Sequence, residues 1–307
     1  MPELPEIETI KIGLQKRIIG LKITKIQILS AKTFIGNPNQ VQGKKVFNIW
    51  RKAKYLGLDL EKISLLFHLK MTGQLIYDDG QRLVGGHPTH DMRDQMPNSH
   101  TRVIFSFSDG SHLYFNDQRR FGWIRVIKGD KGDMGNPSTH STIAQGRTEW
   151  NRSTTSLRTS LGNLGPEPLE KGFSWEVLKE NLLRHKYMPV KVALMDQTVV
   201  SGVGNIYSNE ACFLAGIDPR TKVVTLTDDQ FQALYRGVVR ALRDGIKYGG
   251  ATRAHFVDAE GHKGYFLDYA YVYGRNKHNC KVCKTDIEKI NLGGRGTYFC
   301  PNCQKSL

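Results

Sequence analysis

The sequence predicts an α+β multidomain protein, and three patterns along the chain carry this prediction. Alternating apolar and polar positions, which indicate strands, dominate the chain up to about Lys128. Apolar residues recur at helical spacing from about residue 175 onward. Four of the 5 cysteines lie close together near the C-terminus and predict a small metal-held hairpin. A chain of 307 residues with 39% hydrophobic content can bury more than one core, so we expect at least two domains.

The first residues form an N-terminus that becomes a nucleophile if Met1 is removed, which a small second residue permits. Pro2 then presents a free secondary amine, with the carboxylates of Glu3 and Glu6 just behind it. An α-amino group titrates nearer neutrality than a lysine, so part of it is unprotonated and able to attack a sugar aldehyde carbon. The alternative is a plain helix start, because Pro5 and the acidic residues suit a first helical turn. Both interpretations hold together if a helix carries the nucleophile.

The strand patterns continue to about Lys128. Apolar residues alternate along residues 65–71, and two alternating runs, 103–107 and 113–115, flank an Asp-Gly pair at residues 109–110. Such a pair between alternating runs predicts a β-hairpin. Residues 129–162 are rich in Gly, Ser, Thr, Asn and charge without apolar periodicity, and we interpret them as a linker with an insertion.

Helices are expected over the second part of the chain, at residues 175–185, 189–196 and 205–214 and in a longer run beginning at Thr227. Thr227 and Gln230 form a capping-box pattern at the start of the longer helix.

A glycine-rich turn precedes the helix expected at residues 205–214. Free backbone N–H groups at a helix N-terminus attract phosphate, and Asn205 could cap the helix while donating to a DNA backbone oxygen. A Gly-x-Gly pattern is weak evidence by itself, and a plain helix cap is the alternative.

The cysteine pattern is the most specific local signal. Cys280, Cys283, Cys300 and Cys303 are spaced C-x2-C-x16-C-x2-C, which places two thiolate pairs on two turns and predicts one structural Zn2+. Glycines between the pairs predict a sharp turn that presents Arg295 outward as a candidate phosphate clamp.

The charge balance indicates a polyanionic partner. Lys and Arg number 44 against 29 Asp and Glu, a net charge of +15, which favours nucleic acid over a membrane. A basic cluster at residues 51–55 includes Lys54 and is either a solvated face or a phosphate grip. Arg119 flanks Phe121, an aromatic residue that could wedge between bases, and Met71 could fill the void left by an extruded nucleotide. In isolation, Met71 and Phe121 are more often core residues.

Together these segments resemble the bacterial formamidopyrimidine-DNA glycosylases, the MutM type of base-excision repair enzyme. The matching segments cover nearly the whole chain: residues 2–9, 51–55, 68–73, 117–122, 164–168, 196–207, 272–275 and 293–303. The resemblance implies an N-terminal β-sandwich domain that carries the N-terminal helix, a helix-two-turn-helix domain and a C-terminal zinc finger, with DNA bound between the domains. The boundaries we expect are 1–135 for the first domain, 136–162 for the linker, 163–272 for the second domain and 273–307 for the finger.

The resemblance also implies catalytic roles. Pro2 attacks C1′ of the damaged nucleotide and expels the base to form a Schiff base, after which β and δ elimination cut the strand on both sides. Glu3 acts as acid and base in opening the sugar ring, and Glu6 positions the site and its water.

Lys54 is implied to belong to the catalytic set and to bind the DNA, as five further residues do: Asn205, Arg295, Met71, Arg119 and Phe121. In this series of six, Lys54 comes first. The first three hold phosphates around the flipped nucleotide. The last three occupy the gap that it leaves, and Arg119 reads the orphaned cytosine.

The opening Pro-Glu-Leu-Pro-Glu resembles the branch that acts on oxidised purines, so we expect 8-oxoguanine and formamidopyrimidine lesions. The expected partner is double-stranded DNA with oxidised bases or abasic sites, bound by a monomer in a bacterial cytoplasm. An endonuclease VIII-like glycosylase for oxidised pyrimidines and a non-catalytic damaged-DNA-binding protein remain alternatives. In the segment that resembles the lesion-capping loop, Arg253 stands one place earlier than the family's arginine and Ala254 replaces it. The linker is also longer than usual, and the loop at 85–100 carries several histidines.

Overall fold

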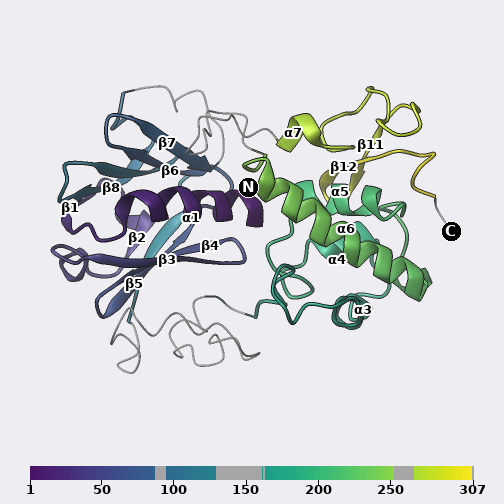
Figure 1. Cartoon of the computed structure of the whole chain (residues 1–307), viewed down its shortest axis with the longest axis horizontal. Helices are drawn as coiled ribbons and strands as arrows, with labels where there is room; N and C mark the ends of the chain where they lie inside the picture. The colour runs from purple at the N-terminus through teal and green to yellow at the C-terminus, as the bar shows by residue number, and fades with distance from the viewer. Residues whose placement is uncertain (87–94, 129–160, 162, 252–265, 306–307) are drawn as a thin grey trace. The chain divides into compact units, whose positions relative to one another are not determined.

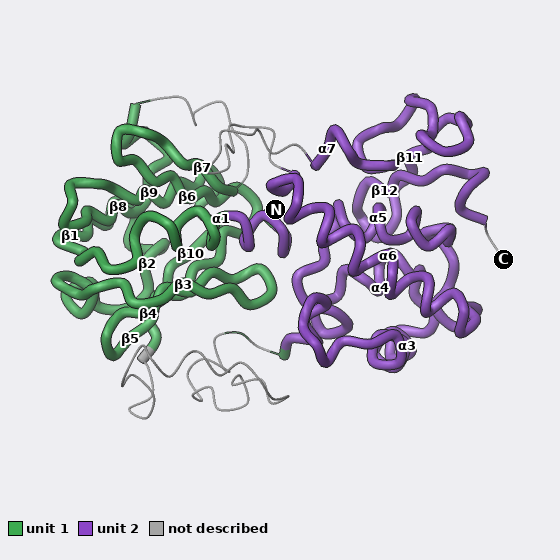
Figure 2. The backbone as a smooth tube through the Cα atoms, in the orientation of Figure 1, with its two compact units in different colours: residues 1–2, 10–163 green, residues 3–9, 164–307 purple. Residues whose placement is uncertain are grey.

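A computed structural model describes residues 1–86, 95–128, 161, 163–251 and 266–305. They form two compact units, shown in Figure 2: unit 1 comprises residues 1–2 and 10–163, and unit 2 comprises residues 3–9 and 164–307. The N-terminal helix α1 (Leu4–Ile18) contributes its first residues to unit 2 and the remainder to unit 1.

Unit 1 contains two five-stranded sheets (Figure 1). The strands of the first sheet, in spatial order, are β1 (Ile23–Ile28), β8 (Thr101–Phe107), β9 (His112–Asp117), β6 (Gly73–Asp78) and β7 (Arg82–Gly86). The strands of the second are β2 (Phe34–Ile35), β10 (Trp123–Lys128), β5 (Ile63–His68), β4 (Tyr55–Leu60) and β3 (Val46–Lys52). β2 and β10 are parallel, whereas the other neighbouring strands are antiparallel.

The two sheets pack into the expected β-sandwich. The Phe67 ring on β5 lies 6.0 Å from the ring of Phe105 on β8, so aromatic side chains join the inner faces of the two sheets. α1 meets an edge strand of each sheet, because Ile10 packs beside Gly85 on β7 and the Gln15 side chain donates to Ile49 O on β3. A helix over both edges protects strands that would otherwise be open to pairing.

The hairpin predicted around residues 109–110 is confirmed. β8 and β9 pair antiparallel with Phe105 opposite Leu113, and Gly110 adopts a φ of +89° in the turn between them. The alternating run at 65–71 does not form one strand along its whole length. β5 ends at His68, and a turn with Lys70 at φ 51° leads into β6, which places Met71 in a loop.

Unit 2 is helical, as expected. Its helices are α3 (Trp175–Leu183), α4 (Val190–Leu194), α5 (Asn205–Leu214), α6 (Asp228–Lys247) and α7 (Phe266–Tyr269). The capping box of Thr227 and Gln230 at the start of α6 is confirmed. Buried residues of α6, among them Phe231 and Leu234, share one hydrophobic core with those of α5 and with Leu4 of α1. The unit ends with the hairpin of β11 (Glu288–Leu292) and β12 (Arg295–Phe299).

Short 3-10 turns complete the elements: η1 (Ala31–Thr33), η2 (Pro38–Gln40) and η6 (Val223–Thr225). Three features of the sequence lie outside the described residues: most of the linker at 129–162, the histidines at 87 and 90, and the differences from the family's pattern at 253 and 254. No helix among the described residues is long and apolar enough to cross a membrane.

Candidate active site and DNA interface

The carboxylate of Glu3 caps helix α5. It is buried at 2% exposure, and it accepts hydrogen bonds from the backbone N–H of Gly204 at 2.7 Å and of Ile206 at 2.8 Å. A longer bond of 3.4 Å from Tyr207 N adds to these two. A Cβ on Gly204 would collide with the Glu3 carboxyl, so glycine permits the approach. A negative charge at the positive end of the helix is thereby fixed in position directly after Pro2 in the chain.

This arrangement corrects one expectation about the glycine-rich turn. Gly204, not Asn205, is the N-cap residue of α5, and the N–H groups expected to attract phosphate donate to Glu3 instead. The partner lies 201 residues earlier in the chain, which is why the local sequence pattern does not show it.

Glu6 fixes the backbone next to the expected nucleophile. Its Oε2 accepts the N–H of Glu3 at 2.7 Å, which belongs to the peptide joining Pro2 to Glu3. Its Oε1 accepts the Tyr207 hydroxyl and the N–H of Ala251, each at 2.7 Å. Burial, followed by the neighbouring Glu6, holds the pKa of Tyr207 well above its usual value, so the hydroxyl remains a donor. Through these three bonds, Glu6 connects the first turn of α1 to Tyr207 and Ala251 and stabilises it.

Asn205 begins α5 and is held from two sides. Its Oδ1 accepts from Lys191 Nζ at 2.6 Å, and its Nδ2 donates to Gly296 O on β12 at 3.1 Å. Burial, together with the nearby charge of Arg295, lowers the pKa of Lys191 to about 8. The structure thus brings Asn205 and Arg295 together with a buried lysine that sequence analysis missed.

The hairpin of β11 and β12 presents Arg295 as predicted. Gly293 and Gly294 form the two-residue turn with φ values of +59° and +71°, which favours glycine at both positions. Arg295 is exposed at the first position of β12, while the N–H of Tyr298 further along the strand donates to Asn209 of α5. The tip is therefore anchored to the helix that carries Asn205.

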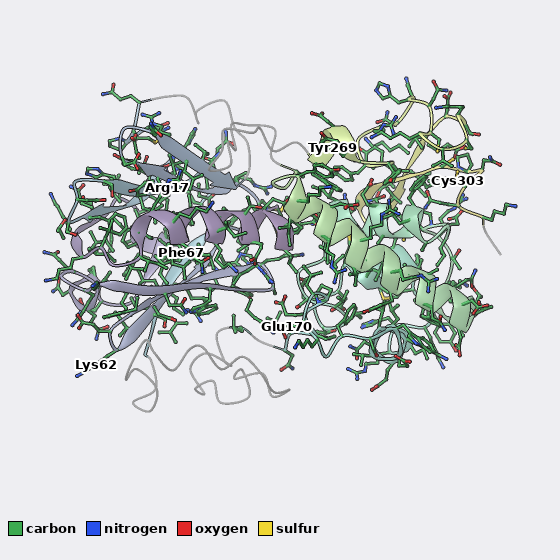
Figure 3. The ribbon with its side chains drawn as sticks, viewed as in Figure 1. Arg17, Lys62, Phe67, Glu170, Tyr269 and Cys303 are labelled. Carbon is green, nitrogen blue, oxygen red and sulfur yellow. The ribbon has the colours of Figure 1, made fainter. Side chains whose placement is uncertain are left out.

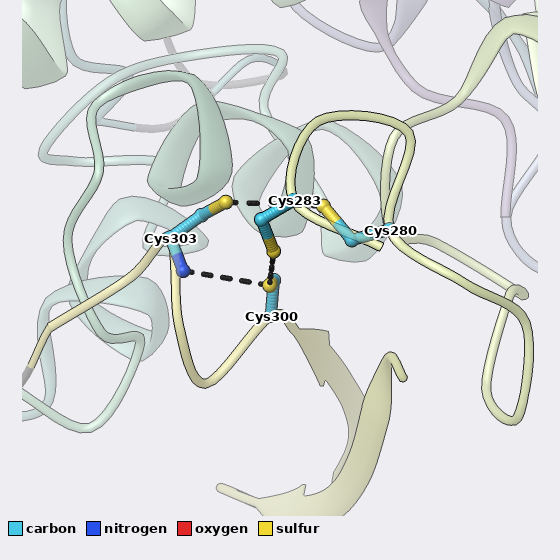
Figure 4. Close-up of side chains that lie close together, drawn as sticks. All are labelled: Cys280, Cys283, Cys300 and Cys303. Atoms are coloured by element: carbon cyan, nitrogen blue, oxygen red, sulfur yellow. Dashed lines mark hydrogen bonds between the residues drawn. The ribbon is translucent and has the colours of Figure 1, made fainter. Parts of the chain in front are cut away.

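The four predicted cysteines converge at the base of this hairpin, as Figure 4 shows. Their Sγ atoms all lie within 4.8 Å of one another, with Cys283 and Cys300 at 3.3 Å and Cys280 and Cys303 at 3.8 Å. A tetrahedral zinc site with Zn–S bonds of about 2.3 Å requires sulfurs about 3.8 Å apart, so the donor set fits Zn2+. Backbone N–H groups donate to the sulfurs of Cys280 and Cys300, which favours thiolates.

Removing zinc is expected to unfold the finger. Cys300→Ser should lower the zinc content from one per chain to near zero, reduce the melting temperature and weaken DNA binding, because the hairpin carrying Arg295 loses its anchor. Zinc analysis, thermal unfolding and a DNA-binding titration measure the three effects. Cys212 is fully buried among apolar residues of unit 2, so Cys212→Ala is the matched control and should keep its zinc. Full zinc content in Cys300→Ser would contradict the four-thiolate site.

In unit 1, Asp117 joins the two loops that carry the expected gap-filling residues. Its carboxylate accepts the Thr72 hydroxyl from one loop and the N–H of Gly122, at 2.6 Å, from the other. The N–H of Arg119 in turn donates to the Thr72 hydroxyl at 3.0 Å. Since Asp117 is 1% exposed, this junction is shielded from water and holds both loops firmly.

Phe121 and Met71 are not core residues, so that alternative is wrong. Phe121 is 56% exposed, Met71 is half-buried, and the Arg119 guanidinium lies over the Phe121 ring at 4.9 Å. An exposed aromatic ring with a cation on its face fits a surface that meets a ligand.

Lys54 lies in the two-residue turn between β3 and β4, after Ala53 with φ 51°. It is 5% exposed, so a solvated face is wrong for this residue. Tyr55 pairs with His68, which places Lys54 at the end of the β4–β5 pair where the loop with Met71 begins. Burial, Lys70 and Lys54 lower the pKa of His68 to about 3, so a neutral imidazole lies beside these lysines.

Comparisons with known proteins cover the chain from end to end. The sequence models of the formamidopyrimidine-DNA glycosylase N-terminal domain and H2TH domain match residues 1–124 and 164–256, and that of the zinc finger found in FPG and IleRS matches 278–305. The formamidopyrimidine-DNA glycosylase of Pelotomaculum thermopropionicum is 36% identical across 99% of both chains. This chain belongs to the formamidopyrimidine-DNA glycosylase family.

Other members of the family agree in sequence and in fold. The Hahella chejuensis formamidopyrimidine-DNA glycosylase is 37% identical across 99% of this chain and 100% of its own. The Lactococcus lactis Fpg, solved in complex with an abasic site containing DNA, aligns with a TM-score of 0.78 and 28% identity over 99% of this chain and 100% of its own. A structure of MutM in complex with carbocyclic 8-oxo-G containing DNA aligns with a TM-score of 0.76 and 29% identity over 99% of this chain and 100% of its own.

Proposed function

We propose that this protein is a bifunctional DNA glycosylase and AP lyase of bacterial base-excision repair that removes 8-oxoguanine and formamidopyrimidines. Relatives along its full length carry the formamidopyrimidine-DNA glycosylase name, and similar structures hold DNA with Fapy-dG or an abasic site. The observation that carries the proposal is the buried Glu3 carboxylate, fixed by helix α5 beside the residue that becomes the N-terminal amine. This geometry suits a reaction that needs a nucleophile and a proton carrier at one carbon.

In the proposed reaction, the lone pair of the Pro2 amine forms a bond to C1′ while the bond from C1′ to the base breaks and the base leaves with a proton. The sugar ring then opens as its oxygen takes a proton, which gives an iminium between Pro2 and C1′. An iminium acidifies the neighbouring C2′ hydrogens, so β and then δ elimination release the two phosphates in turn. Removal of Met1 is required, because a proline nitrogen in an amide has no lone pair available for attack.

Glu3 is proposed as the acid and base of this sequence, and Glu6 as a positioning residue. Glu3 follows Pro2 directly and its carboxylate is already oriented by α5, so little reorganisation is needed on binding. Glu6 holds the intervening N–H and the Tyr207 hydroxyl and contacts the reacting atoms only through them.

The remaining residues are proposed to bind the DNA in two sets. Asn205 and Arg295 of unit 2 hold phosphates, as does Lys54 of unit 1. Met71, Arg119 and Phe121, whose two loops Asp117 joins, occupy the gap left by the flipped nucleotide. Flipping costs a few kcal/mol, so a preorganised filler and phosphate contacts both favour it.

Borohydride trapping tests the proposal. The purified protein, with Met1 removal verified by mass spectrometry, is incubated with duplexes carrying 8-oxoguanine, formamidopyrimidine, an oxidised pyrimidine or an abasic site. We expect a covalent adduct that maps to Pro2 on the purine-lesion and abasic duplexes, and faster excision of purine than of pyrimidine lesions. Preference for the oxidised pyrimidine would favour the endonuclease VIII-like alternative. Tight binding of these duplexes without any adduct would favour the alternative of a non-catalytic damaged-DNA-binding protein.

The buried Lys191 predicts a pH dependence of DNA binding. Its pKa of about 8 is low, so Lys191 is charged at pH 7 and largely neutral at pH 9, where it attracts phosphate less. Binding of an abasic-site duplex should therefore weaken by roughly threefold between pH 7 and pH 9, because a bound phosphate raises the pKa of Lys191 and a rise of about half a unit corresponds to about threefold in binding. In Lys191→Met the affinity should be lower at pH 7, and the decrease in affinity from pH 7 to pH 9 should disappear. If this variant kept the same decrease in affinity, the pH dependence would belong to another titratable group.

A further inference from the structure

Helix α6 presents four basic side chains along one exposed face. Arg236, Arg240, Arg243 and Lys247 are spaced four, three and four residues apart, which places them on one side of the helix. Within the described part of the chain, Arg236 and Arg243 form no ion pair, and Arg240 is 61% exposed beside Asp244 at 3.7 Å. We call this set the α6 basic stripe.

A groove runs beside the stripe. It has a volume of ≈ 600 Å³ and includes the three arginines together with Leu214, Ala233, Tyr235 and Val239. A second hollow of ≈ 270 Å³ shares Leu214, Arg240 and Asp244 with it and extends to the tyrosines at 248, 269 and 271. Because the two hollows share these three lining residues, we call them together the α6 groove; Figure 3 labels Tyr269, which lines the smaller hollow.

The far wall of the groove is fixed before any partner binds. The Glu210 carboxylate, 1% exposed, accepts the backbone N–H groups of Tyr271, Val272 and Tyr273 at 2.7, 3.0 and 2.8 Å. The Tyr271 hydroxyl accepts from Arg240 at 3.2 Å, and the rings of Tyr248 and Tyr269 stack at 3.8 Å. A preformed groove lowers the entropic cost of binding.

The α6 groove is separate from the proposed phosphate contacts of unit 2. α6 packs on the side of α5 that carries Tyr207 and Ala211, whereas β12 is bonded to Asn205 and Asn209. Residues 205 and 207 point about 200° apart on a helix, so α6 and the zinc hairpin lie on opposite sides of α5. Figure 1 shows α6 in front of α5. Binding of the damaged nucleotide through Asn205 and Arg295 does not account for this second basic surface.

The dimensions of the groove fit a single extended chain. The part of α6 that lines the larger hollow, residues 233–244, rises about 16 Å at about 1.5 Å per residue. An extended chain of about five residues, at about 3.3 Å per residue, covers that length.

We propose that the α6 groove binds an extended acidic segment of a partner protein. Carboxylates of that segment pair with Arg236, Arg240 and Arg243, and its apolar side chains pack on Leu214 and Val239. The combination of guanidinium groups with an apolar floor favours such a peptide over a phosphate backbone, because bare phosphates leave the floor uncovered. The partner is bound through chemistry that the glycosylase reaction does not use, so the two activities are separable.

Fluorescence anisotropy tests the proposal with the full-length, zinc-loaded protein. The probe is a labelled seven-residue peptide in which aspartates alternate with leucine and phenylalanine. Comparison probes are the same peptide with asparagine in place of aspartate, a heptamer of aspartate alone, and a labelled single-stranded DNA. The test variant is Arg236→Glu with Arg243→Glu. The matched control is Arg184→Glu with Lys186→Glu, which changes the same charge on exposed residues beyond α3.

We expect saturable binding of the alternating peptide, weaker binding of both comparison peptides, and a loss of affinity of roughly tenfold or more in the test variant but not in the control. Excision of 8-oxoguanine and the melting temperature should stay unchanged in both variants. Equal losses in test and control variants, or equal binding of the aspartate heptamer, would reduce the effect to net charge and overturn the proposal. Binding of the single-stranded DNA instead of the peptide, lost in the test variant, would assign the groove to nucleic acid and overturn it as well.

Discussion

A chain that keeps a residue in front of Pro2 is expected to lose base excision almost completely. Inserting glutamine between Met1 and Pro2 prevents removal of Met1, because aminopeptidase cleavage needs a small second residue. The proline nitrogen then stays in an amide, and the free amine moves two residues away from its position in the processed chain. Correct placement of a reacting group is worth at least about 10³-fold in rate, so single-turnover excision of 8-oxoguanine should fall by at least that factor.

Affinity for DNA provides the control for this insertion. Glu3, Asn205 and Arg295 are unaltered, so binding of a duplex with a stable abasic analogue should change little. Mass spectrometry verifies that Met1 is retained. Wild-type excision and trapping by the retained chain would show that the Pro2 amine is not the nucleophile.

The second large effect is expected from Glu3→Gln. The amide keeps one acceptor for the N–H groups of α5 but loses the negative charge and the ability to transfer a proton. General acid–base catalysis contributes typically about 10²- to 10⁴-fold, so excision should fall within that range. The free energy of unfolding should fall by about 1–3 kcal/mol, the usual worth of hydrogen bonds to a charged group.

Glu6→Gln separates chemistry from positioning. Its carboxylate accepts three bonds, and an amide can accept at one end only, so the loss of stability should match or exceed that of Glu3→Gln. The loss of excision rate should be smaller, because Glu6 contacts the reacting atoms only through the Glu3 N–H and the Tyr207 hydroxyl. Urea unfolding and single-turnover kinetics measure the two quantities. A larger rate loss in Glu6→Gln than in Glu3→Gln would reverse the proposed roles.

Local patterns in the sequence predict those parts of the fold whose causes are local. The hairpin around Gly110, the capping box of α6 and the four-cysteine cluster each depend on residues close together in the chain, and all three are confirmed. Cys280 and Cys303 mark the limit of this range. They lie 23 residues apart, and their contact is predictable only because the C-x2-C spacing on each turn is diagnostic of a zinc site.

Features that depend on distant partners were not predictable in this way. The cap of α5 comes from Glu3, and Glu6 of the first turn accepts the hydroxyl of Tyr207, which a helical apolar pattern marks only as a core residue. The role of Asp117 as a junction depends on a hydroxyl 45 residues away. Lys54 is buried in a tight turn with a positive φ at Ala53, and alanine gives no sequence signal for that turn.

The discontinuity of unit 2 limits how the protein can be divided. A polypeptide that begins at residue 164 holds nearly all of unit 2 but lacks Leu4, which is fully buried in its core, and the carboxylates of Glu3 and Glu6. In that fragment the backbone of α5 loses its acceptor and the Tyr207 hydroxyl is buried without one, at a cost of several kcal/mol. Engineers who want the helical half and its zinc finger as a separate module must therefore supply the first nine residues as well, fused or as an added peptide.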